Sequence, residues 1–324
     1  MKMLIVGGAG YIGSHIVLEA LNYGYSVKVF DNLSTGKMAN VDKNAEFFQG
    51  TTMSNGDLSR AFKEDKFDCV IHLAANKAAG ESMTNPSKYA TNNIIGSLNL
   101  INYCVKYGVE TFIFSSSAAV YGIPNYTPID ELHPLKPTNY YGHTKLMVEN
   151  SLSWFSRLKG MNFASLRYFN AAGFDIKNRI VGIENSPQNL IPIVMEAAIG
   201  ERKKIDIYGN DYATKDGTGI RDYIHVNDLS SAHIKAINYV KSEKKNLTIN
   251  LGTGSGFSVL DVINKVENIS KVELRYDFKE RRDGDSDIVT ADAKLAKKLI
   301  SWEPIYSDLD TIISTTWKVY SLLK

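Results

Sequence analysis

The sequence has little cysteine, no long apolar run and almost no net charge, and each scarcity argues against a class of protein. Two cysteines in 324 residues do not form a disulfide scaffold. No run approaches the roughly 18 apolar residues of a membrane span, and the apolar stretch at 3–6 is too short for a signal peptide. We therefore expect a cytoplasmic protein without a membrane partner. Because 37 basic residues face 35 acidic ones without a basic cluster, we also expect no nucleic-acid partner.

Metal ligation is not expected either. The spacing of the six histidines does not match known ligand patterns, so each is interpreted as a packing or surface residue. These histidines are His15, His72, His133, His143, His225 and His233.

Three glycines, Gly7, Gly10 and Gly13, follow the apolar run at 3–6 and lead into an amphipathic segment. A strand that enters a helix through such a turn lets the backbone and the positive end of the helix approach a pyrophosphate. Asp31 ends the next apolar run, where a carboxylate accepts from a ribose 2′-hydroxyl and repels a 2′-phosphate. The combination predicts an NAD site.

Strand-like and helix-like segments alternate through the first half, which is typical of an α/β fold with a doubly wound parallel sheet of the Rossmann type. Beyond residue 170 the pattern loosens, and we expect a smaller mixed α/β substrate domain. The predicted division is 1–169 for NAD and 170–324 for the substrate, with the chain crossing back between them. Strands are predicted at 27–30, 46–48, 69–73, 111–114, 163–166, 205–208, 248–251 and 273–276. Helices are predicted at 86–107, 139–155, 190–199, 228–240, 260–269 and 309–322.

A second group of residues contains the candidates for catalysis. The serines at 115–117 end one predicted strand, and Tyr141 and Lys145 lie four apart on a predicted helix, so they share one face. A neighbouring cation and a positive nicotinamide favour the phenolate of a tyrosine whose ordinary pKa is about 10. Tyr141 can then exchange a proton with a substrate hydroxyl, while Ser117 bonds the same oxygen.

These motifs, taken together, resemble those of the UDP-hexose 4-epimerases, which are extended members of the short-chain dehydrogenase/reductase family. The resemblance runs almost end to end, and the block at 208–229 is its most specific part. The matching segments are GGAGYIGSH at 7–15, FDNLSTG at 30–36, AANKAAGES at 74–82, FSSSAAVYG at 114–122, YYGHTKLMVE at 140–149, LRYFNAAG at 166–173, YGNDYATKDGTGIRDYIHVNDL at 208–229, NLGTGSGFSVLDV at 250–262 and RRDGD at 281–285.

The resemblance implies an isomerase of carbohydrate metabolism that inverts C4 of a UDP-hexose reversibly, as in the interconversion of UDP-glucose and UDP-galactose. Tyr141 would remove the 4-hydroxyl proton as C4 gives hydride to NAD, and a transient 4-keto sugar would turn over before the hydride returns. Remote binding energy from the nucleotide would hold that intermediate. The resemblance also implies a homodimer formed through the helices at 86–107 and 140–157.

The resemblance assigns site residues by motif. The catalytic residues are Tyr141, Lys145 and Ser117. The cofactor residues are Gly7, Gly10, Tyr11, Ile12, Gly13, Asp31, Asn32, Leu33, Ser34, Thr35, Gly36, Thr51, Leu73, Ala74, Ala75, Lys77, Asn92, Ser115, Tyr141, Lys145 and Phe169. The substrate residues are Lys77, Ser117, Tyr141, Asn170, Asn189, Leu190, Arg221, Tyr223, Arg282 and Asp285. Arginine suits a diphosphate because its planar fork makes charged bidentate bonds.

Three positions depart from the family pattern. Thr51 replaces an aspartate that bonds the adenine amino group, and Ala119 replaces a threonine that follows the serine run. Val289 lies where some relatives place a tyrosine beside the sugar. The smaller side chain leaves space near C2 of the sugar, so N-acetylhexosamine nucleotides are hypothesised as further substrates.

Other functions of the same fold stay open. A nucleotide-sugar dehydratase needs acidic residues after the strand-end serine, where this chain has Ala118 and Ala119. A decarboxylase needs a carboxylate-binding arrangement that we do not identify. A non-catalytic NAD-binding regulator would not need the Tyr141 and Lys145 pair.

Overall fold

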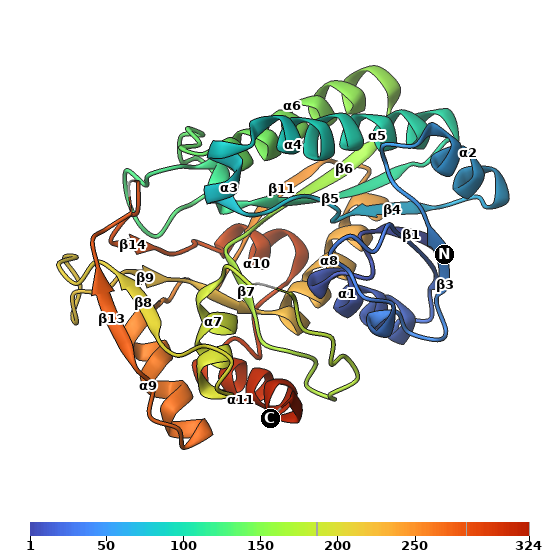
Figure 1. Cartoon of the computed structure of the whole chain (residues 1–324). Coiled ribbons are helices and arrows are strands. Elements are labelled where there is room, and N and C mark those ends of the chain that lie inside the picture. Colours follow the sequence, from blue (N-terminus) through green and yellow to red (C-terminus); the bar gives the residue numbers. More distant parts are fainter. Residues whose placement is uncertain (186, 283, 324) are drawn as a thin grey trace.

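A seven-stranded parallel sheet is the centre of the computed structural model, which describes residues 1–185, 187–282 and 284–323 (Figure 1). The strand order is β11-β6-β5-β4-β1-β2-β3, and every neighbouring pair is parallel. The strands are β1 (Lys2–Val6), β2 (Ser26–Asp31), β3 (Glu46–Gln49), β4 (Cys69–His72), β5 (Thr111–Ser117), β6 (Asn162–Tyr168) and β11 (Leu247–Leu251). The predicted doubly wound α/β fold is confirmed.

Helices cover both faces of this sheet because its strands are apolar on both sides. In β1, Met3 and Ile5 belong to one buried cluster, whereas Leu4 and Val6 belong to another. Alternate side chains of a strand point to opposite faces, so each cluster fills one side. On one side lie α2 (Asn55–Glu64), α5 (Gly96–Lys106) and α6 (Tyr140–Lys159), and on the other lie α1 (Tyr11–Asn22), α8 (Val226–Glu243) and α10 (Lys294–Ile300) (Figure 1).

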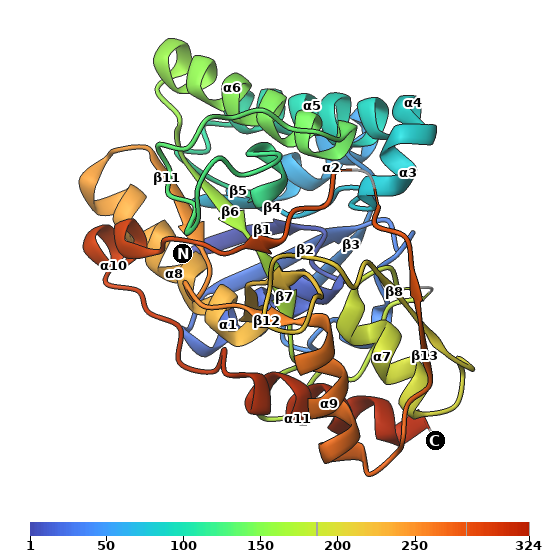
Figure 2. The same cartoon turned by 90° about the vertical axis from the view of Figure 1, so that its left-hand side faces the viewer.

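A smaller region packs beyond the edge where the parallel strands end, as the rotated view shows (Figure 2). Its core is a separate buried cluster that includes Val194, Ile207, Ile263 and Ile312. Its helices are α7 (Leu190–Ala198), α9 (Val259–Ser270) and α11 (Leu309–Tyr320). Its short strands are β7 (Asn170–Ala172), β8 (Ile205–Tyr208), β9 (Ile220–Arg221), β10 (Tyr223–His225), β12 (Phe257–Ser258), β13 (Tyr276–Lys279) and β14 (Ile288–Val289).

The chain passes between the two regions more than once. After β7 and the segments that follow it, α8 returns to cover the large sheet, and β11 then pairs with β6 at the sheet edge. The division of the chain at residue 170 stays a prediction.

Most predicted elements are present, with differences in position and extent. The strand predicted at 273–276 begins three residues later in the structure, where β13 starts at Tyr276 and pairs with β8. Leu274, before the strand, is buried in the core of the smaller region. The helix predicted over 86–107 contains three parts: α4 (Pro86–Tyr89), the π-helical η2 (Ala90–Ile95) and α5. Three helices, α2, α3 (Ala79–Thr84) and α10, were not predicted, although the Ser54 side chain caps α2 by accepting from the Asp57 N–H.

None of the described helices is long and apolar enough to cross a membrane. Both cysteines are buried free thiols.

His133 is buried in a loop, and four further histidines are buried within helices and strands: His15, His72, His225 and His233. Burial lowers the pKa of His72 to about 3 and the pKa of the other three to about 4, because the imidazolium would lose its hydration. A histidine titrates near pH 6.5 in an unfolded chain. The unfolded state therefore binds more protons than the folded state between about pH 6.5 and pH 4.

Acidification should therefore destabilise the protein, and the loss should begin below about pH 6.5. The expected loss is on the order of 1 kcal/mol per histidine for each pH unit. Thermal unfolding followed from pH 7.5 to pH 5 measures it. The His72→Gln variant should show a shallower pH dependence than the unmodified protein, and an equal slope in the two proteins would contradict this account.

Candidate functional site

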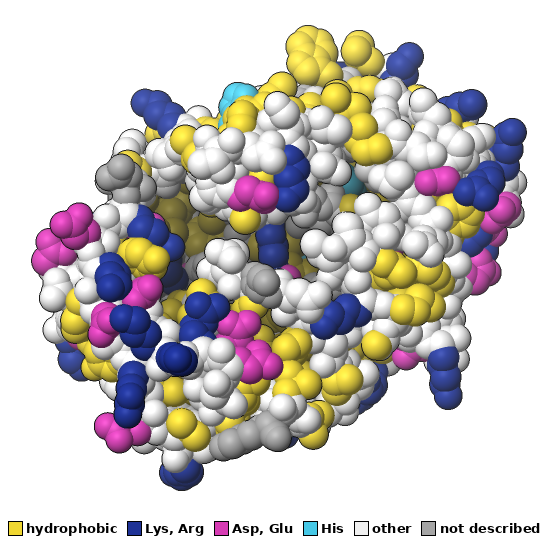
Figure 3. Space-filling view, viewed as in Figure 1, with side chains coloured by type: hydrophobic (Ala, Val, Ile, Leu, Met, Phe, Trp, Pro, Cys, Tyr) yellow, Lys and Arg dark blue, Asp and Glu magenta, His cyan; other side chains and the backbone are white. Residues whose placement is uncertain are grey.

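The candidate site lies where the carboxyl ends of the large parallel sheet face the smaller region. The space-filling view shows a hollow between these two parts, with basic side chains at its border (Figure 3). A pocket beside the first glycine turn is lined by residues of both parts, among them Tyr11, Gly173, Asn189 and Pro192. Ligands of open α/β sheets bind at this edge.

The glycine turn between β1 and α1 is tight at two points. Gly7 has a φ of 86°, and a Cβ atom there would lie 2.6 Å from the backbone nitrogen of Ala74. At Gly13 a Cβ atom would lie 2.1 Å from the carbonyl oxygen of Gly7. No described side chain caps the N-terminus of α1 at Gly10. The turn thus forms a backbone-lined cradle at a helix N-terminus, which is suited to a phosphate group.

Asp31 lies beside this cradle at the end of β2. Its carboxylate accepts from the backbone N–H of Ala9 at 3.0 Å and from that of Leu33 at 2.8 Å. The loop that follows folds back on the glycine turn, since a Cβ atom at Gly36 would lie 2.9 Å from the carbonyl carbon of Ala9. The structure therefore brings the predicted acid and the predicted glycine turn together.

The predicted catalytic side chains also lie together. Asn139 caps α6 by accepting from the Gly142 N–H at 2.9 Å, which sets the start of the helix that carries Tyr141 and Lys145. The ammonium of Lys145 is buried, donates to the carbonyl oxygen of Ser115 at 2.7 Å and lies 5.8 Å from the centre of the Tyr141 ring. The Ser117 hydroxyl ends the same strand and accepts from the Ala119 N–H at 3.2 Å.

Burial dominates the titration of this pair. Loss of hydration raises the pKa of Tyr141, and the neighbouring Ser117 hydroxyl lowers it. Burial lowers the pKa of Lys145 to about 7, and the Glu149 carboxylate acts in the opposite direction. In the protein alone, the Tyr141 phenol is therefore a weaker acid than the sequence argument from the nearby cation assumed.

Two other predicted residues, Lys77 and Asn92, are exposed. Lys77 makes an ion pair with Glu184, which lies on the segment after β7. The Asn92 amide donates to the carbonyl oxygen of Lys88 at 3.0 Å. The buried amide beside the catalytic helix is that of Asn93, which exchanges two backbone bonds with Asn76 and donates to the Thr144 hydroxyl at 3.1 Å. The sequence motif predicted a role for Asn92 and none for Asn93, the residue that follows it.

Thr51 replaces the aspartate of the family pattern, but a different aspartate, Asp57 of α2, lies beside it. The Thr51 N–H donates to the Asp57 carboxylate at 3.2 Å, and the Arg60 guanidinium donates to the other oxygen of that carboxylate. These bonds hold the pKa of Asp57 below its ordinary value.

The predicted nucleotide residues form a charged group on the smaller region. Arg221 lies 3.6 Å from the Asp285 carboxylate, and Arg282 lies 2.8 Å from it. The guanidinium carbon of Arg282 is 5.0 Å from the centre of the Tyr208 ring, an aromatic that sequence reasoning missed. Both arginines therefore flank one carboxylate beside an exposed aromatic surface.

The remaining predicted substrate residues lie on β7, on β10 and at the start of α7. The Asn170 amide donates to the Asp222 carbonyl oxygen at 2.9 Å. Tyr223 is buried in β10, the strand that pairs with β7. Asn189 and Leu190 begin α7.

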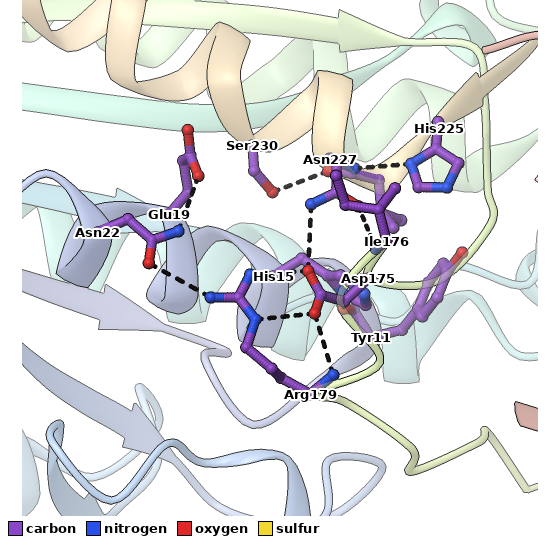
Figure 4. Close-up of polar contacts among 11 residues, drawn as sticks. Tyr11, His15, Glu19, Asn22, Asp175, Ile176, Arg179, His225, Asn227 and Ser230 are labelled. Carbon is purple, nitrogen blue, oxygen red and sulfur yellow. Dashed lines mark hydrogen bonds and ion pairs between the residues drawn. The ribbon is translucent and has the colours of Figure 1, made fainter. Parts of the chain in front are cut away.

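A polar cluster behind the glycine turn joins α1 to the segment after β7 (Figure 4). The Tyr11 hydroxyl donates to the Gly173 carbonyl oxygen, and the His15 ring bonds the Tyr11 carbonyl oxygen at 2.8 Å. Asp175 is buried and accepts three bonds from Arg179, which hold its pKa at about 2 against the opposing effect of burial. The cluster ties the first cofactor turn to the smaller region.

The two remaining departures lie near the catalytic serines. Val289 is partly buried and packs against a cluster that contains Val120, Tyr121 and Ile129. The Ala119 carbonyl oxygen lies against α6, so that a Cβ atom at Gly142 would approach it to 2.3 Å. Among the described residues, no group of histidine, cysteine or acidic side chains could hold a metal ion.

Comparison with known proteins gives one consistent result. The profile of the "NAD dependent epimerase/dehydratase family" matches residues 3–252. A UDP-glucose 4-epimerase of Lacticaseibacillus casei is 40% identical over 318 residues, which is 98% of this chain and 96% of that protein.

Solved structures are similar over the same length. The crystal structure of UDP-glucose 4-epimerase from Brucella ovis, in complex with NAD, has 39% identity and a TM-score of 0.96, with 98% of each chain covered. The UDP-Glc/GlcNAc 4-epimerase from Campylobacter jejuni has 40% identity and a TM-score of 0.87, with 99% of each chain covered.

Proposed function

Because the chain belongs to the NAD dependent epimerase/dehydratase family, we propose that it is an isomerase that inverts C4 of a UDP-hexose reversibly with NAD as cofactor. The observation that carries this proposal is the meeting of Tyr141, Lys145 and the end of β5 beside the edge where the glycine turn lies. The reaction that we propose is the interconversion of UDP-glucose and UDP-galactose.

The cradle fits the cofactor on its own geometry. The missing side chains at Gly7 and Gly13 allow the pyrophosphate to approach the backbone, and the Asp31 carboxylate is placed to accept from ribose hydroxyls. Bound NAD supplies the hydride acceptor and donor for C4. The positive end of α1 would stabilise the phosphates, and the acid at Asp31 would disfavour a cofactor with a 2′-phosphate.

The residues of α6 and β5 move the proton. Tyr141 removes the proton of the 4-hydroxyl and returns it to the same oxygen after the sugar has turned its other face. Ser117 bonds the same oxygen and holds it against the phenol. The Lys145 ammonium, 5.8 Å from the centre of the Tyr141 ring, would favour the phenolate electrostatically.

The arginines of the smaller region anchor the nucleotide. Arg221 and Arg282 can exchange part of their pairing with Asp285 for bidentate bonds to a diphosphate, and Asp285 then accepts from a ribose hydroxyl. Anchoring at this remote group leaves the hexose free to turn, which inversion at C4 requires.

The alternative functions are less well supported. Ala118 and Ala119 form the 3₁₀ turn η3 (Ala118–Val120) directly after Ser117, and neither side chain can transfer a proton to expel water. A dehydratase is therefore not favoured, and the intact Tyr141 and Lys145 pair argues against a non-catalytic regulator.

Purified protein incubated with UDP-galactose should produce UDP-glucose until the two reach a constant ratio. The Tyr141→Phe variant should bind NAD as tightly as the unmodified protein and lose turnover by about 10²-fold or more, because only the proton carrier is removed. Separation of the products by chromatography measures the reaction. Equal turnover in the variant would assign the proton transfer to another group, and no product from the unmodified protein would refute the epimerase.

We further propose that the pocket accepts UDP-N-acetylhexosamines. Val289 offers a small, partly buried side chain beside Tyr121 and Phe169, where a tyrosine would fill more space. The similar protein from Campylobacter jejuni is described as a UDP-Glc/GlcNAc 4-epimerase.

Turnover of UDP-N-acetylglucosamine should accordingly be detectable in the unmodified protein. The Val289→Tyr variant should lose roughly tenfold or more of that activity by steric exclusion while it keeps most of its turnover of UDP-glucose. Parallel assays of the two sugars in both proteins provide the comparison. An unmodified protein that converts only the plain hexose would remove this proposal.

We propose a cytoplasmic homodimer, with α5 and α6 packing against their copies. These helices lie side by side (Figure 1), and α6 exposes Met147, Trp154 and Leu158 by 39%, 56% and 67%. Exposed apolar side chains on one helix favour such an association. Cell fractionation tests the location.

Sedimentation should give twice the mass of one chain at micromolar concentration. A double variant, Trp154→Glu with Leu158→Glu, should sediment as a single chain, because burying two carboxylates in an apolar interface is costly. A single-chain mass for the unmodified protein across all concentrations would contradict the dimer.

A further inference from the structure

The helix face that carries Tyr141 and Lys145 continues for one more turn to Glu149. This carboxylate is buried and accepts from the Arg167 Nε at 3.0 Å and from its second terminal nitrogen at 2.6 Å. It also accepts from the Ser116 hydroxyl at 2.5 Å. Residues four apart share a helix face, so Glu149 follows Lys145 as Lys145 follows Tyr141.

The bond to Ser116 connects Glu149 with the reactive strand end. Ser116 lies between Ser115, whose carbonyl oxygen accepts from Lys145, and Ser117. On the other side, Arg167 donates to the Tyr121 hydroxyl at 2.9 Å, and that hydroxyl donates to the Asn250 amide oxygen at 2.7 Å. One buried polar network therefore runs from α6 through β5 and β6 to β11.

We propose that Glu149 is a positioning residue of the epimerase site: its carboxylate, fixed by Arg167 and Ser116, keeps Lys145 in its ammonium form at the end of β5. This inference rests on the proposed function, because it assumes that Lys145 assists Tyr141 in the epimerase reaction. Both side chains are buried one helical turn apart, so the carboxylate attracts the ammonium with little screening by water. Nothing in the sequence motif assigns a role to Glu149.

The charges around Lys145 come from four elements. On α6 it is flanked by the Tyr141 phenol and by Glu149, and on β5 by the Ser115 carbonyl and the Phe114 ring.

From β4 it is approached by His72, whose ring stays neutral because burial lowers its pKa to about 3. β6 contributes the Arg167 guanidinium, which donates to both oxygens of the Glu149 carboxylate, and the Tyr168 phenol, which interacts with Ser115 and Tyr141. The Glu149 carboxylate opposes the effect of burial on the pKa of Lys145.

Two variants that break the same ion pair should act in opposite directions. Glu149→Gln removes the negative charge and leaves Arg167, so Lys145 should lose its proton at lower pH. Arg167→Met leaves the negative charge unneutralised, so Lys145 should keep its proton to higher pH. A merely structural role would move both variants the same way, because both lose the same buried bonds.

The first measurement is the pH dependence of kcat for UDP-galactose in the holoenzyme. The alkaline limb should move down by about one pH unit in Glu149→Gln and up by a similar amount in Arg167→Met, while KM changes little. Glu149→Asp, which keeps the charge, should lower thermal stability and leave the limb in place. If Glu149→Gln does not fold, the upward shift in Arg167→Met carries the test.

The second measurement does not depend on catalysis. Titration of the Lys145 Cε signal by NMR, assigned by its loss in Lys145→Arg, should show the same two opposite shifts without substrate. Shifts in one direction, or none, in both measurements would overturn the role of Glu149. Absence of epimerisation with opposite NMR shifts would refute the proposed function and leave the role of Glu149 supported.

Discussion

The bond from the buried Lys145 ammonium to the carbonyl oxygen of Ser115 is the contact on which the rest of the site depends. It fixes α6 against the end of β5, so that the Tyr141 phenol and the Ser117 hydroxyl reach the same space. A lysine is seldom buried without a charged partner close by. Its position is stable here because a carbonyl dipole, two aromatic rings and the Glu149 carboxylate surround it.

A second fixed point lies in the smaller region. The buried carboxylate of Asp222 accepts from the backbone N–H groups of Thr253, Gly254 and Ala291, although burial raises its pKa. These bonds join the loop after β11 and the segment after β14 to the point between β9, which carries Arg221, and β10, which carries Tyr223. The proposed nucleotide anchor and the proposed chemistry of α6 are therefore held by separate polar groups, an arrangement that would allow a ligand to be bound firmly at one end and to move at the other.

The sequence was most informative where the relevant contacts are local. The glycine turn, Asp31 and the spacing of Tyr141 and Lys145 each follow from rules that act within one strand, turn or helix. Asn93 was missed because its contacts are with Asn76 and Thr144, which are distant in the chain, and no local pattern encodes them. The Lys77 and Glu184 pair and the contact of Arg167 with Tyr121 join residues far apart in the chain, and no local pattern encodes them.

The late arrival of β11 has a consequence during synthesis. Residues 162–168 form β6, yet their outer neighbour is not made until the ribosome has added about 80 more residues. Until then the nascent sheet ends in a strand whose backbone groups on one side lack their final partner. Such an edge invites pairing with other chains, so the emerging polypeptide has its greatest need of chaperone protection in that interval.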